Sequence, residues 1–124
     1  MPSGRLLVVD DQVEITALVD EHFTSLGYQV DVAHHGAAGL IQAAARRPDA
    51  VLLDINMPEV SGEEVLDRLH AIDRSVPIVM LTGNADADLA RRFLRRGAFD
   101  YIAKPFQLDV LERVVATAVA FGRR

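Results

Sequence analysis

Short apolar runs alternate with longer stretches of helical spacing, and this alternation limits the fold more than any other feature of the chain. The apolar runs cover residues 6–9, 28–33, 50–53, 77–81 and 99–103. The helical stretches cover residues 13–26, 36–47, 61–72, 86–96 and 106–121. Runs 6–9, 50–53 and 77–81 are almost uninterrupted, as in strands that are covered on both faces. The pattern therefore predicts an α/β protein with five strands and five helices.

The connections between the predicted strands indicate how the strands are arranged. Each step from one strand to the next is long enough for a right-handed parallel crossover through a helix. We therefore expect a three-layer α/β/α sandwich around a parallel sheet, formed by residues 1–124 as a single domain without an effector domain. In such sheets, ligands bind at the carboxyl ends of the strands, where the strand order reverses.

The composition excludes several other classes of protein. The net charge of −5 gives no general attraction for nucleic acid or for anionic membranes. No apolar run reaches the roughly 18 residues that span a bilayer, and the chain contains no Cys. We therefore expect a cytoplasmic protein without disulfide bonds, thiolate metal sites, membrane insertion or direct contact with nucleic acid.

Polar residues follow four of the five predicted strands at their carboxyl ends. In chain order they are Asp10, Asp11, Asp54, Thr82 and Lys104. A parallel sheet brings these strand ends to one edge, so we expect the side chains to meet in one crevice. Lys104 is the only lysine among 13 basic residues, which is either chance or a need for a compact ammonium group.

Taken singly, these residues also have ordinary structural interpretations. Asp11 could cap the helix that follows, with Glu14 completing a capping box. Thr82 could belong to a turn, and Lys104 could be a surface charge. Asp54 is harder to explain in this way, because a lone carboxylate among apolar residues would pay a large desolvation penalty or bind a proton.

Taken together, the residues fit a magnesium site beside a phosphoryl acceptor. Gathered carboxylates need a cation, and oxygen ligands without Cys or a nearby His favour Mg²⁺ over Zn²⁺. Mg²⁺ commonly binds one or two carboxylates and leaves positions for phosphate oxygens. A carboxylate beside such an ion, an ammonium and a hydroxyl can attack phosphorus to give an aspartyl phosphate.

The same residues resemble the receiver domain of bacterial two-component response regulators, a chemotaxis-regulator-like fold. Six residues carry the resemblance in the family's order and approximate spacing, namely Asp10, Asp11, Asp54, Thr82, Lys104 and Pro105. Residues 54–62 (DINMPEVSG) are similar to the loop after the family's phosphorylated strand, and residues 97–106 (GAFDYIAKPF) to its fifth-strand signature. The resemblance covers essentially the whole chain and implies a flavodoxin-like, doubly wound (βα)5 fold with strand order 2-1-3-4-5.

The resemblance also implies a role for the acidic residues and their neighbours. Asp54 would accept the phosphoryl group. Asp11, Asp54 and the backbone carbonyl of Asn56 would bind Mg²⁺, and Asp10 would help to position the ion through water. Asn56 and Asn84 occupy positions at which this family tunes the lifetime of the phosphoryl group.

The remaining site residues acquire their roles from the same resemblance. Lys104 would pair with the phosphoryl oxygens, through a Lys-Pro bond that is typically cis in this family. Thr82 would donate a hydrogen bond to one of these oxygens, and Gly83 would leave room for them. Tyr101 matches the switch aromatic residue, which turns into the space that Thr82 vacates when it moves.

The implied function is phosphorelay signal transduction. A sensor histidine kinase or a histidine phosphotransfer protein would donate the phosphoryl group, and would dock near exposed residues of the first helix such as Glu14 and His22. The module would catalyse only its own phosphorylation and dephosphorylation. Its output face would combine the fourth helix, the fifth strand and the last helix, and would bind an effector or a second copy.

Two surface features leave alternatives open. The fourth predicted helix carries Arg91, Arg92, Arg95 and Arg96. These cations are either a solvated face near a helix C-terminus or part of the output face. The last helix has a broad apolar stripe, which Val110, Val114 and Phe121 widen. The widened stripe is either irregular core packing or a face for self-association or effector docking.

Three competing functions are weaker. A haloacid-dehalogenase-like phosphatase requires D-x-D after the first strand, whereas this chain has Asp10, Asp11 and Gln12 and no cap domain. A flavodoxin-like binder would place its Thr-Gly-Asn phosphate loop after the first strand, whereas Thr82 follows the fourth. A degenerate receiver that only binds partners would not need the complete set of acidic, hydroxyl and ammonium groups.

Overall fold

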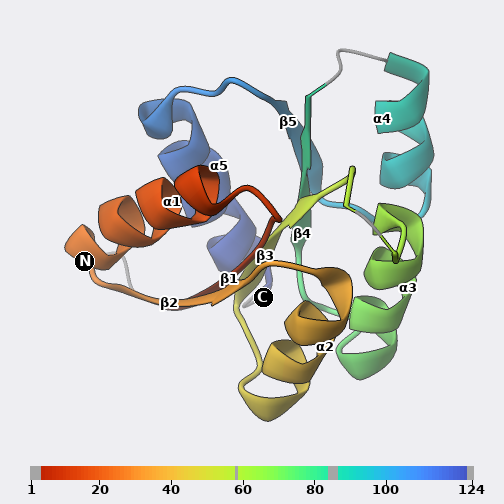
Figure 1. Ribbon diagram of the computed structural model, residues 1–124, viewed down its shortest axis with the longest axis horizontal. Coiled ribbons are helices and arrows are strands. Elements are labelled where there is room, and N and C mark those ends of the chain that lie inside the picture. The colour runs from red at the N-terminus through yellow and green to blue at the C-terminus, as the bar shows by residue number, and fades with distance from the viewer. Residues whose placement is uncertain (1–3, 58, 84–86, 123–124) are drawn as a thin grey trace.

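A parallel sheet of five strands forms the middle layer of the protein, with helices on both faces (Figure 1). The computed structural model describes residues 4–57, 59–83 and 87–122. The strands are β1 (Gly4–Val9), β2 (Tyr28–Ala33), β3 (Ala50–Asp54), β4 (Ile78–Thr82) and β5 (Asp100–Ala103). The helices are α1 (Val13–Ser25), α2 (Gly36–Ala45), α3 (Gly62–Ile72), α4 (Ala87–Arg95) and α5 (Leu108–Gly122).

The strand order is β2-β1-β3-β4-β5, and every neighbouring pair is parallel. This order confirms the predicted 2-1-3-4-5 topology of a doubly wound sheet. The chain adds β2 on one side of β1 and then adds β3, β4 and β5 on the other. The order therefore reverses between β1 and β3, and the carboxyl ends of these two strands flank the crevice where such folds bind ligands.

Two hydrophobic clusters hold the three layers together. Alternate residues of β1 point to opposite faces, so Leu7 joins the cluster under α2, α3 and α4, and Leu6 joins the cluster under α1 and α5. Phe93 anchors α4 in the first cluster, and Phe23 anchors α1 in the second. Strands β3 and β4 are buried along their whole length, which explains their uninterrupted apolar runs.

The structure shows how the N-termini of α3 and α1 are capped. The hydroxyl of Ser61 accepts a hydrogen bond from the backbone N–H of Glu64 and caps α3, as the spacing of Ser and Glu in a capping box favours. The proposed cap at Asp11 is wrong, because α1 begins at Val13 with Gln12 in the cap position and without a side-chain capping bond. The carboxylate of Asp10, rather than that of Asp11, accepts the N–H of Gln12.

Other boundaries differ from the prediction by one or two residues. Helix α2 ends at Ala45 instead of residue 47, and α5 begins at Leu108 instead of residue 106. The imidazole of His35 caps α2 by accepting a hydrogen bond from Ala38 N–H at 3.2 Å. The predicted start of the fourth helix, at residue 86, lies outside the described residues. In the part of the chain that the structure describes, no helix is both long and apolar enough to cross a membrane.

Candidate functional site

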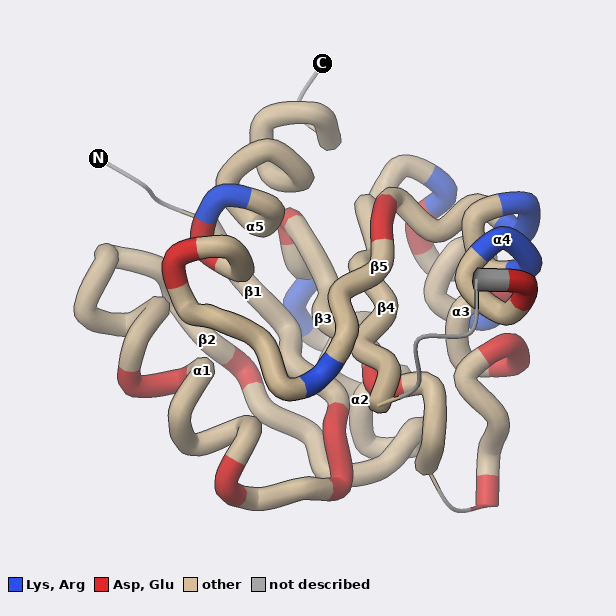
Figure 2. Tube along the Cα trace, turned by 90° about the horizontal axis from the view of Figure 1, so that it is seen from above, with Lys and Arg blue, Asp and Glu red and all other residues tan. Residues whose placement is uncertain are grey.

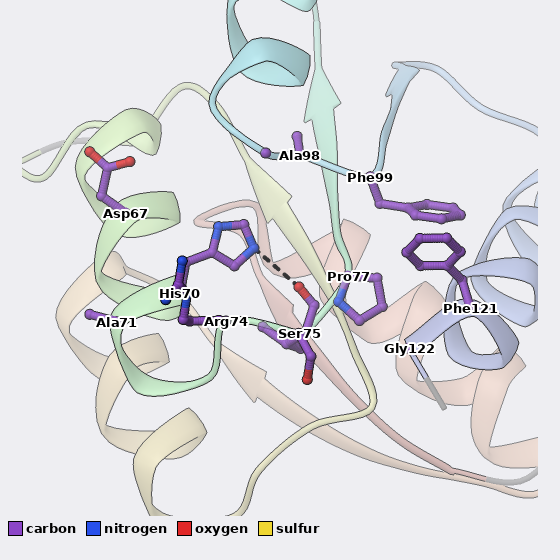
Figure 3. A pocket seen from close by; sticks show the side chains of 12 residues that line it. Asp67, His70, Ala71, Arg74, Ser75, Pro77, Ala98, Phe99, Phe121 and Gly122 are labelled. Carbon is purple, nitrogen blue, oxygen red and sulfur yellow. Dashed lines mark hydrogen bonds between the residues drawn. The ribbon is translucent and has the colours of Figure 1, made fainter. Parts of the chain in front are cut away.

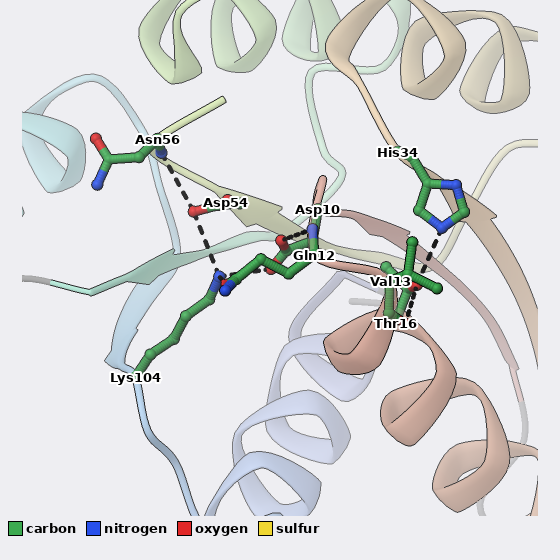
Figure 4. Close-up of polar contacts among 8 residues, drawn as sticks. All are labelled: Asp10, Gln12, Val13, Thr16, His34, Asp54, Asn56 and Lys104. Carbon is green, nitrogen blue, oxygen red and sulfur yellow. Dashed lines mark hydrogen bonds and ion pairs between the residues drawn. The ribbon is translucent and has the colours of Figure 1, made fainter. Parts of the chain in front are cut away.

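The polar residues that follow the strands meet at the carboxyl edge of the sheet, as the topology requires (Figure 4). One carboxylate oxygen from each of Asp10, Asp11 and Asp54 lies within 4.8 Å of the others. Asp10 and Asp54 are buried at the ends of β1 and β3, whereas Asp11 is exposed. The cluster therefore has a buried floor of two carboxylates and one open side.

Lys104 is the cation that faces this cluster. Its Nζ lies 2.7 Å from Oδ2 of Asp10 and 3.6 Å from Oδ1 of Asp54. The backbone N–H of Lys104 donates to the carbonyl of Thr82 at 2.7 Å, which ties β5 to the end of β4. The Lys104–Pro105 peptide is cis, as the resemblance implied. A single ammonium thus serves two buried carboxylates.

This shortage of positive charge changes the acidity of Asp54. Burial and the nearby charge of Asp10 raise the pKa of the Asp54 carboxyl from 3.8 to about 6. The N–H of Asn56, which donates to Oδ1 at 3.2 Å, and the Lys104 ammonium lower this pKa but do not cancel the rise. The folded protein therefore holds Asp54 in a site that disfavours its negative charge.

The donor set of the cluster fits a hard divalent cation. Oδ2 of Asp10 is buried and accepts no hydrogen bond from the residues that the structure describes, and its contact with Lys104 is an ion pair without hydrogen-bond geometry. Three carboxylates and one ammonium leave an excess of negative charge at the site. Carboxylate oxygens are the ligands that Mg²⁺ prefers, and the exposed side at Asp11 admits an ion from solvent.

Thr82 and Gly83 form the wall of the site on the side of β4. Thr82 is buried at the end of the strand, and its backbone pairs with Ala103 of β5. Among the described residues, a side chain added at Gly83 would meet no atom within 4 Å. The room that Gly83 would leave for phosphoryl oxygens stays a prediction. Asn84 lies outside the described residues.

Tyr101 occupies the middle of β5 and faces away from the core. The residue is 42% exposed, whereas its neighbour Ile102 is buried. Its backbone pairs with Met80 in β4, two residues before Thr82. The structure therefore places the Tyr101 side chain on the outer side of β5, and its switch role stays a prediction.

One site residue was missed from the sequence. The side-chain oxygen of Gln12 accepts a hydrogen bond from Nζ of Lys104 at 2.8 Å, and Figure 4 shows this contact beside Asp10. The residue type gives no signal for such a role. Its position directly after the Asp10-Asp11 pair is the only feature of the sequence that could have drawn attention to it.

The arginines of the fourth helix are partly paired within the molecule. Arg92 forms an ion pair with Glu63 of α3, and Arg96 contacts both Glu63 and Asp67. Figure 2 shows the basic residues gathered on α4. Arg91 pairs with an acidic residue of its own helix, at 2.6 Å. The cluster is therefore neither wholly solvated nor wholly available to a partner.

The apolar stripe of α5 divides into a buried part and an exposed edge. Four residues of the stripe are buried in the core, namely Leu111, Val115, Ala118 and Val119. Phe121 is half exposed and packs on Phe99, with ring centroids 5.2 Å apart. Both rings line a groove of about 1170 Å³ next to Pro77 (Figure 3). This groove lies at the amino ends of β4 and β5, so it is at the opposite edge of the sheet from the carboxylates.

The chain matches a known family over most of its length. The family described as the response regulator receiver domain matches residues 6–116. Sporulation initiation phosphotransferase F of Bacillus subtilis is 35% identical over 115 residues, which cover 93% of each chain. Transcriptional regulatory protein PrrA of Mycobacterium tuberculosis is 40% identical over 122 residues. That match covers 98% of this chain but 51% of PrrA, and the match to regulatory protein AtoC of Escherichia coli covers 25% of AtoC.

Solved structures agree with the sequence matches. The receiver domain of NtrX from Brucella abortus superimposes with a TM-score of 0.88 at 33% identity and covers 93% of this chain and 98% of that one. Chemotaxis protein CheY4 of Vibrio cholerae gives a TM-score of 0.88 at 27% identity and covers 94% and 99%. The chain belongs to the receiver domain family of two-component response regulators.

Proposed function

We propose that this receiver domain accepts a phosphoryl group on Asp54 in a Mg²⁺-dependent reaction and passes a signal by changing its surface. The observation that carries the proposal is the meeting of a buried carboxylate with raised pKa, two further carboxylates and one ammonium at the carboxyl edge of the sheet. A purely structural ion cluster would not need an excess of negative charge.

Each residue has a defined part in the proposed reaction. Asp10, Asp11, Asp54 and the backbone carbonyl of Asn56 would hold Mg²⁺, which would neutralise the carboxylates and the phosphoryl oxygens. A carboxylate oxygen of Asp54 forms a bond to phosphorus while the bond from phosphorus to the donor's leaving group breaks. With a phosphohistidine donor, the leaving imidazole keeps the bonding electron pair and takes up a proton.

Lys104 and Thr82 then hold the product. The ammonium of Lys104 moves from Asp10 to a phosphoryl oxygen, which carries more negative charge than a carboxylate. The hydroxyl of Thr82 donates to another phosphoryl oxygen. When Thr82 moves, Tyr101 turns from its exposed position toward the space behind it, and the packing of α4 and β5 changes.

The donor would be a sensor histidine kinase or a histidine phosphotransfer protein. Exposed apolar residues of α1 support docking beside the site, since Val13 is 59% exposed and Leu18 is 45% exposed. Glu14 is exposed and stays a predicted contact. His22 is less exposed than expected, because its Nε2 lies 3.1 Å from a carboxylate oxygen of Glu112 in α5. The cytoplasmic location also stays a prediction.

The output would be read on the face formed by α4, β5 and α5. Tyr101 and Arg95 are exposed there and could contact an effector or a second copy of the chain. The domain would act as a switch and would catalyse only its own phosphorylation and dephosphorylation.

The direct test is incubation with Mg²⁺ and acetyl phosphate, followed by intact-mass analysis. We expect one phosphoryl adduct on the wild type and on Asp88→Asn, an exposed control, and none on Asp54→Asn. Chelation of Mg²⁺ should suppress the adduct. An adduct on Asp54→Asn that matches the wild type would reject the assignment of Asp54.

A further inference from the structure

Gln12 links the end of β1, where Asp10 lies, to Lys104, the cation that faces the acidic cluster. Its backbone N–H donates to Oδ1 of Asp10 at 2.9 Å, so its main chain is fixed to the end of β1. Its side-chain oxygen accepts from Nζ of Lys104 at 2.8 Å, across 92 positions of the sequence. The side chain does not cap α1, so this contact is the one hydrogen bond that the structure records for it among the described residues.

The ammonium of Lys104 is consequently held on the β1 side of the site. Two oxygens from the end of β1 lie within 2.8 Å of Nζ, one in an ion pair with Asp10 and one in a hydrogen bond with Gln12, whereas the nearest oxygen of Asp54 is 3.6 Å away. The Lys104 side chain is only 13% exposed, whereas Gln12 is exposed, so solvent reaches this hydrogen bond from the side of Gln12. In the proposed reaction, Nζ of Lys104 leaves Asp10 and moves closer to Asp54. This movement breaks the contact of Nζ with Gln12.

We propose that Gln12 is a positioning residue that restrains Lys104 in the unphosphorylated state. The inference rests on the proposed function, in which Lys104 transfers to the phosphoryl oxygens on Asp54. An interaction that exists only before the reaction stabilises the starting state and slows the step that breaks it. Gln12 therefore limits the rate of phosphorylation and leaves the binding of Mg²⁺ unchanged.

Three variants separate this role from a general structural role. Gln12→Met keeps the length of the side chain and removes the acceptor. Gln12→Glu replaces a neutral acceptor with a charged one, which holds an ammonium more strongly. Gln42→Met makes the same chemical change on α2, away from Lys104, and is the matched control.

Phosphorylation by acetyl phosphate at saturating Mg²⁺ gives the kinetic test. We expect Gln12→Met to raise the maximal rate about fivefold, the size expected for loss of one hydrogen bond. Gln12→Glu should lower the rate, and Gln42→Met should match the wild type. The Mg²⁺ concentration for half-maximal rate should not change in Gln12→Met.

A second measurement uses the single lysine of the chain and needs no phosphorylation. Protein labelled with [¹⁵N,¹³C]lysine contains one lysine side chain, so the Cε and Nζ signals belong to Lys104 alone. In Mg²⁺-free protein, these signals should shift in Gln12→Met, and the ammonium hydrogens should exchange faster with water. The signals of Gln42→Met should overlay those of the wild type.

The outcomes distinguish this inference from the proposed function. If the wild type takes no phosphoryl group, the proposed function fails, and the lysine signals still show whether Gln12 holds Lys104. If the wild type is phosphorylated and Gln12→Met reacts at the same rate or more slowly, the restraining role is overturned. Unchanged Lys104 signals in Gln12→Met would also overturn it.

Discussion

At the scale of single residues, the site is defined by a charge that the fold does not stabilise by itself. Asp54 ends a wholly buried strand, and its carboxyl pKa is raised because water is excluded and Asp10 lies nearby. The site therefore gains from any event that adds positive charge or removes a negative one. Binding of a divalent cation is such an event, which links the electrostatics of the acidic cluster to its proposed use.

Replacing Asp54 by Asn should make the metal-free protein more stable at neutral pH. The folded pKa of about 6 lies above the ordinary 3.8, so the free energy of unfolding of the wild type falls as pH rises between these values. Asp54→Asn removes this loss and should gain about 3 kcal/mol at pH 7, because one pKa unit corresponds to about 1.4 kcal/mol. Urea unfolding at pH 4 and pH 7 checks this, and the gain should shrink at pH 4. An equal gain at both pH values would contradict the charge argument.

Glu59, in the loop between β3 and α3, has a backbone conformation that suits Gly. Its φ of 75° lies in the left-handed region, which costs a residue with Cβ about 1 kcal/mol or more. Glu59→Gly should therefore raise the free energy of unfolding by about 0.5–1 kcal/mol, after the entropy of Gly is subtracted. Glu59→Ala removes the same carboxylate but keeps Cβ, and should show no gain in chemical denaturation.

At the scale of elements, α2 lies very close to β1 and to α3 because the position that faces each of them has no side chain. A Cβ at Gly39 would lie 2.7 Å from Cγ2 of Val9, which is buried at the end of β1. A Cβ at Gly36 would lie equally close to Val65 of α3. Gly39 therefore sets how closely α2 approaches the strand that precedes Asp10.

Gly39→Ala should separate α2 from β1 and destabilise the protein. Overpacking of a core typically costs about 1–3 kcal/mol, which outweighs the helix propensity of about 1 kcal/mol that Ala regains. We expect a net loss of about 1 kcal/mol in urea unfolding. Ile41→Ala, on the exposed face of the same helix, should change the stability little. A Gly39→Ala protein as stable as the wild type would show that Val9 can move at no cost.

The strands were predictable from the sequence, and the starts of some helices were not. Uninterrupted apolar runs identify β3 and β4, because no other soluble element of that length is covered on both faces. The helical spacing predicts the start of α1 at Val13 correctly, but the expected cap at Asp11 is wrong, because the carboxylate of Asp10 accepts the N–H of Gln12 instead. Such a choice between adjacent carboxylates depends on the turn, which the sequence pattern does not define.

For the candidate site as well, some contacts were predictable from the sequence and others were not. The carboxyl ends of parallel strands lie at the same edge of a sheet, so the sequence alone predicts that Asp10, Asp54 and Lys104 lie close together. The bond from Lys104 to Gln12 and the ion pairs from Arg96 to α3 depend on side-chain conformations and on helix positions. Neither has a periodic or local signal, so both had to come from the structure.

At the scale of the whole molecule, the acidic site and the exposed face of β5 are parts of one sheet. Thr82 ends β4, and the neighbouring strand carries Tyr101 and Lys104. The proposed signal would travel through this shared backbone. A phosphoryl group would have to favour the active packing by roughly 5.5 kcal/mol to convert a 1:99 mixture into 99:1.

Mg²⁺ should stabilise the whole fold through the acidic cluster. An ion that binds only the folded chain raises the melting temperature as its concentration exceeds its dissociation constant. We expect this rise in the wild type, together with a weaker dependence of stability on pH. Asp11→Asn should melt like the wild type without Mg²⁺, because Asp11 is exposed, and should gain much less when Mg²⁺ is added. Equal gains in both proteins would exclude Asp11 as a ligand.

The central claim, that Asp54 becomes an aspartyl phosphate, can be tested by chemical trapping at the level of one residue. Borohydride reduces an acyl phosphate to an alcohol, so a phosphorylated Asp becomes homoserine. After treatment with Mg²⁺ and acetyl phosphate, reduction and digestion, tandem mass spectrometry should find homoserine at position 54 and at no other Asp. Homoserine at Asp10 or Asp11 with an unmodified Asp54, or no homoserine in a protein that carries a phosphoryl adduct, would contradict the account.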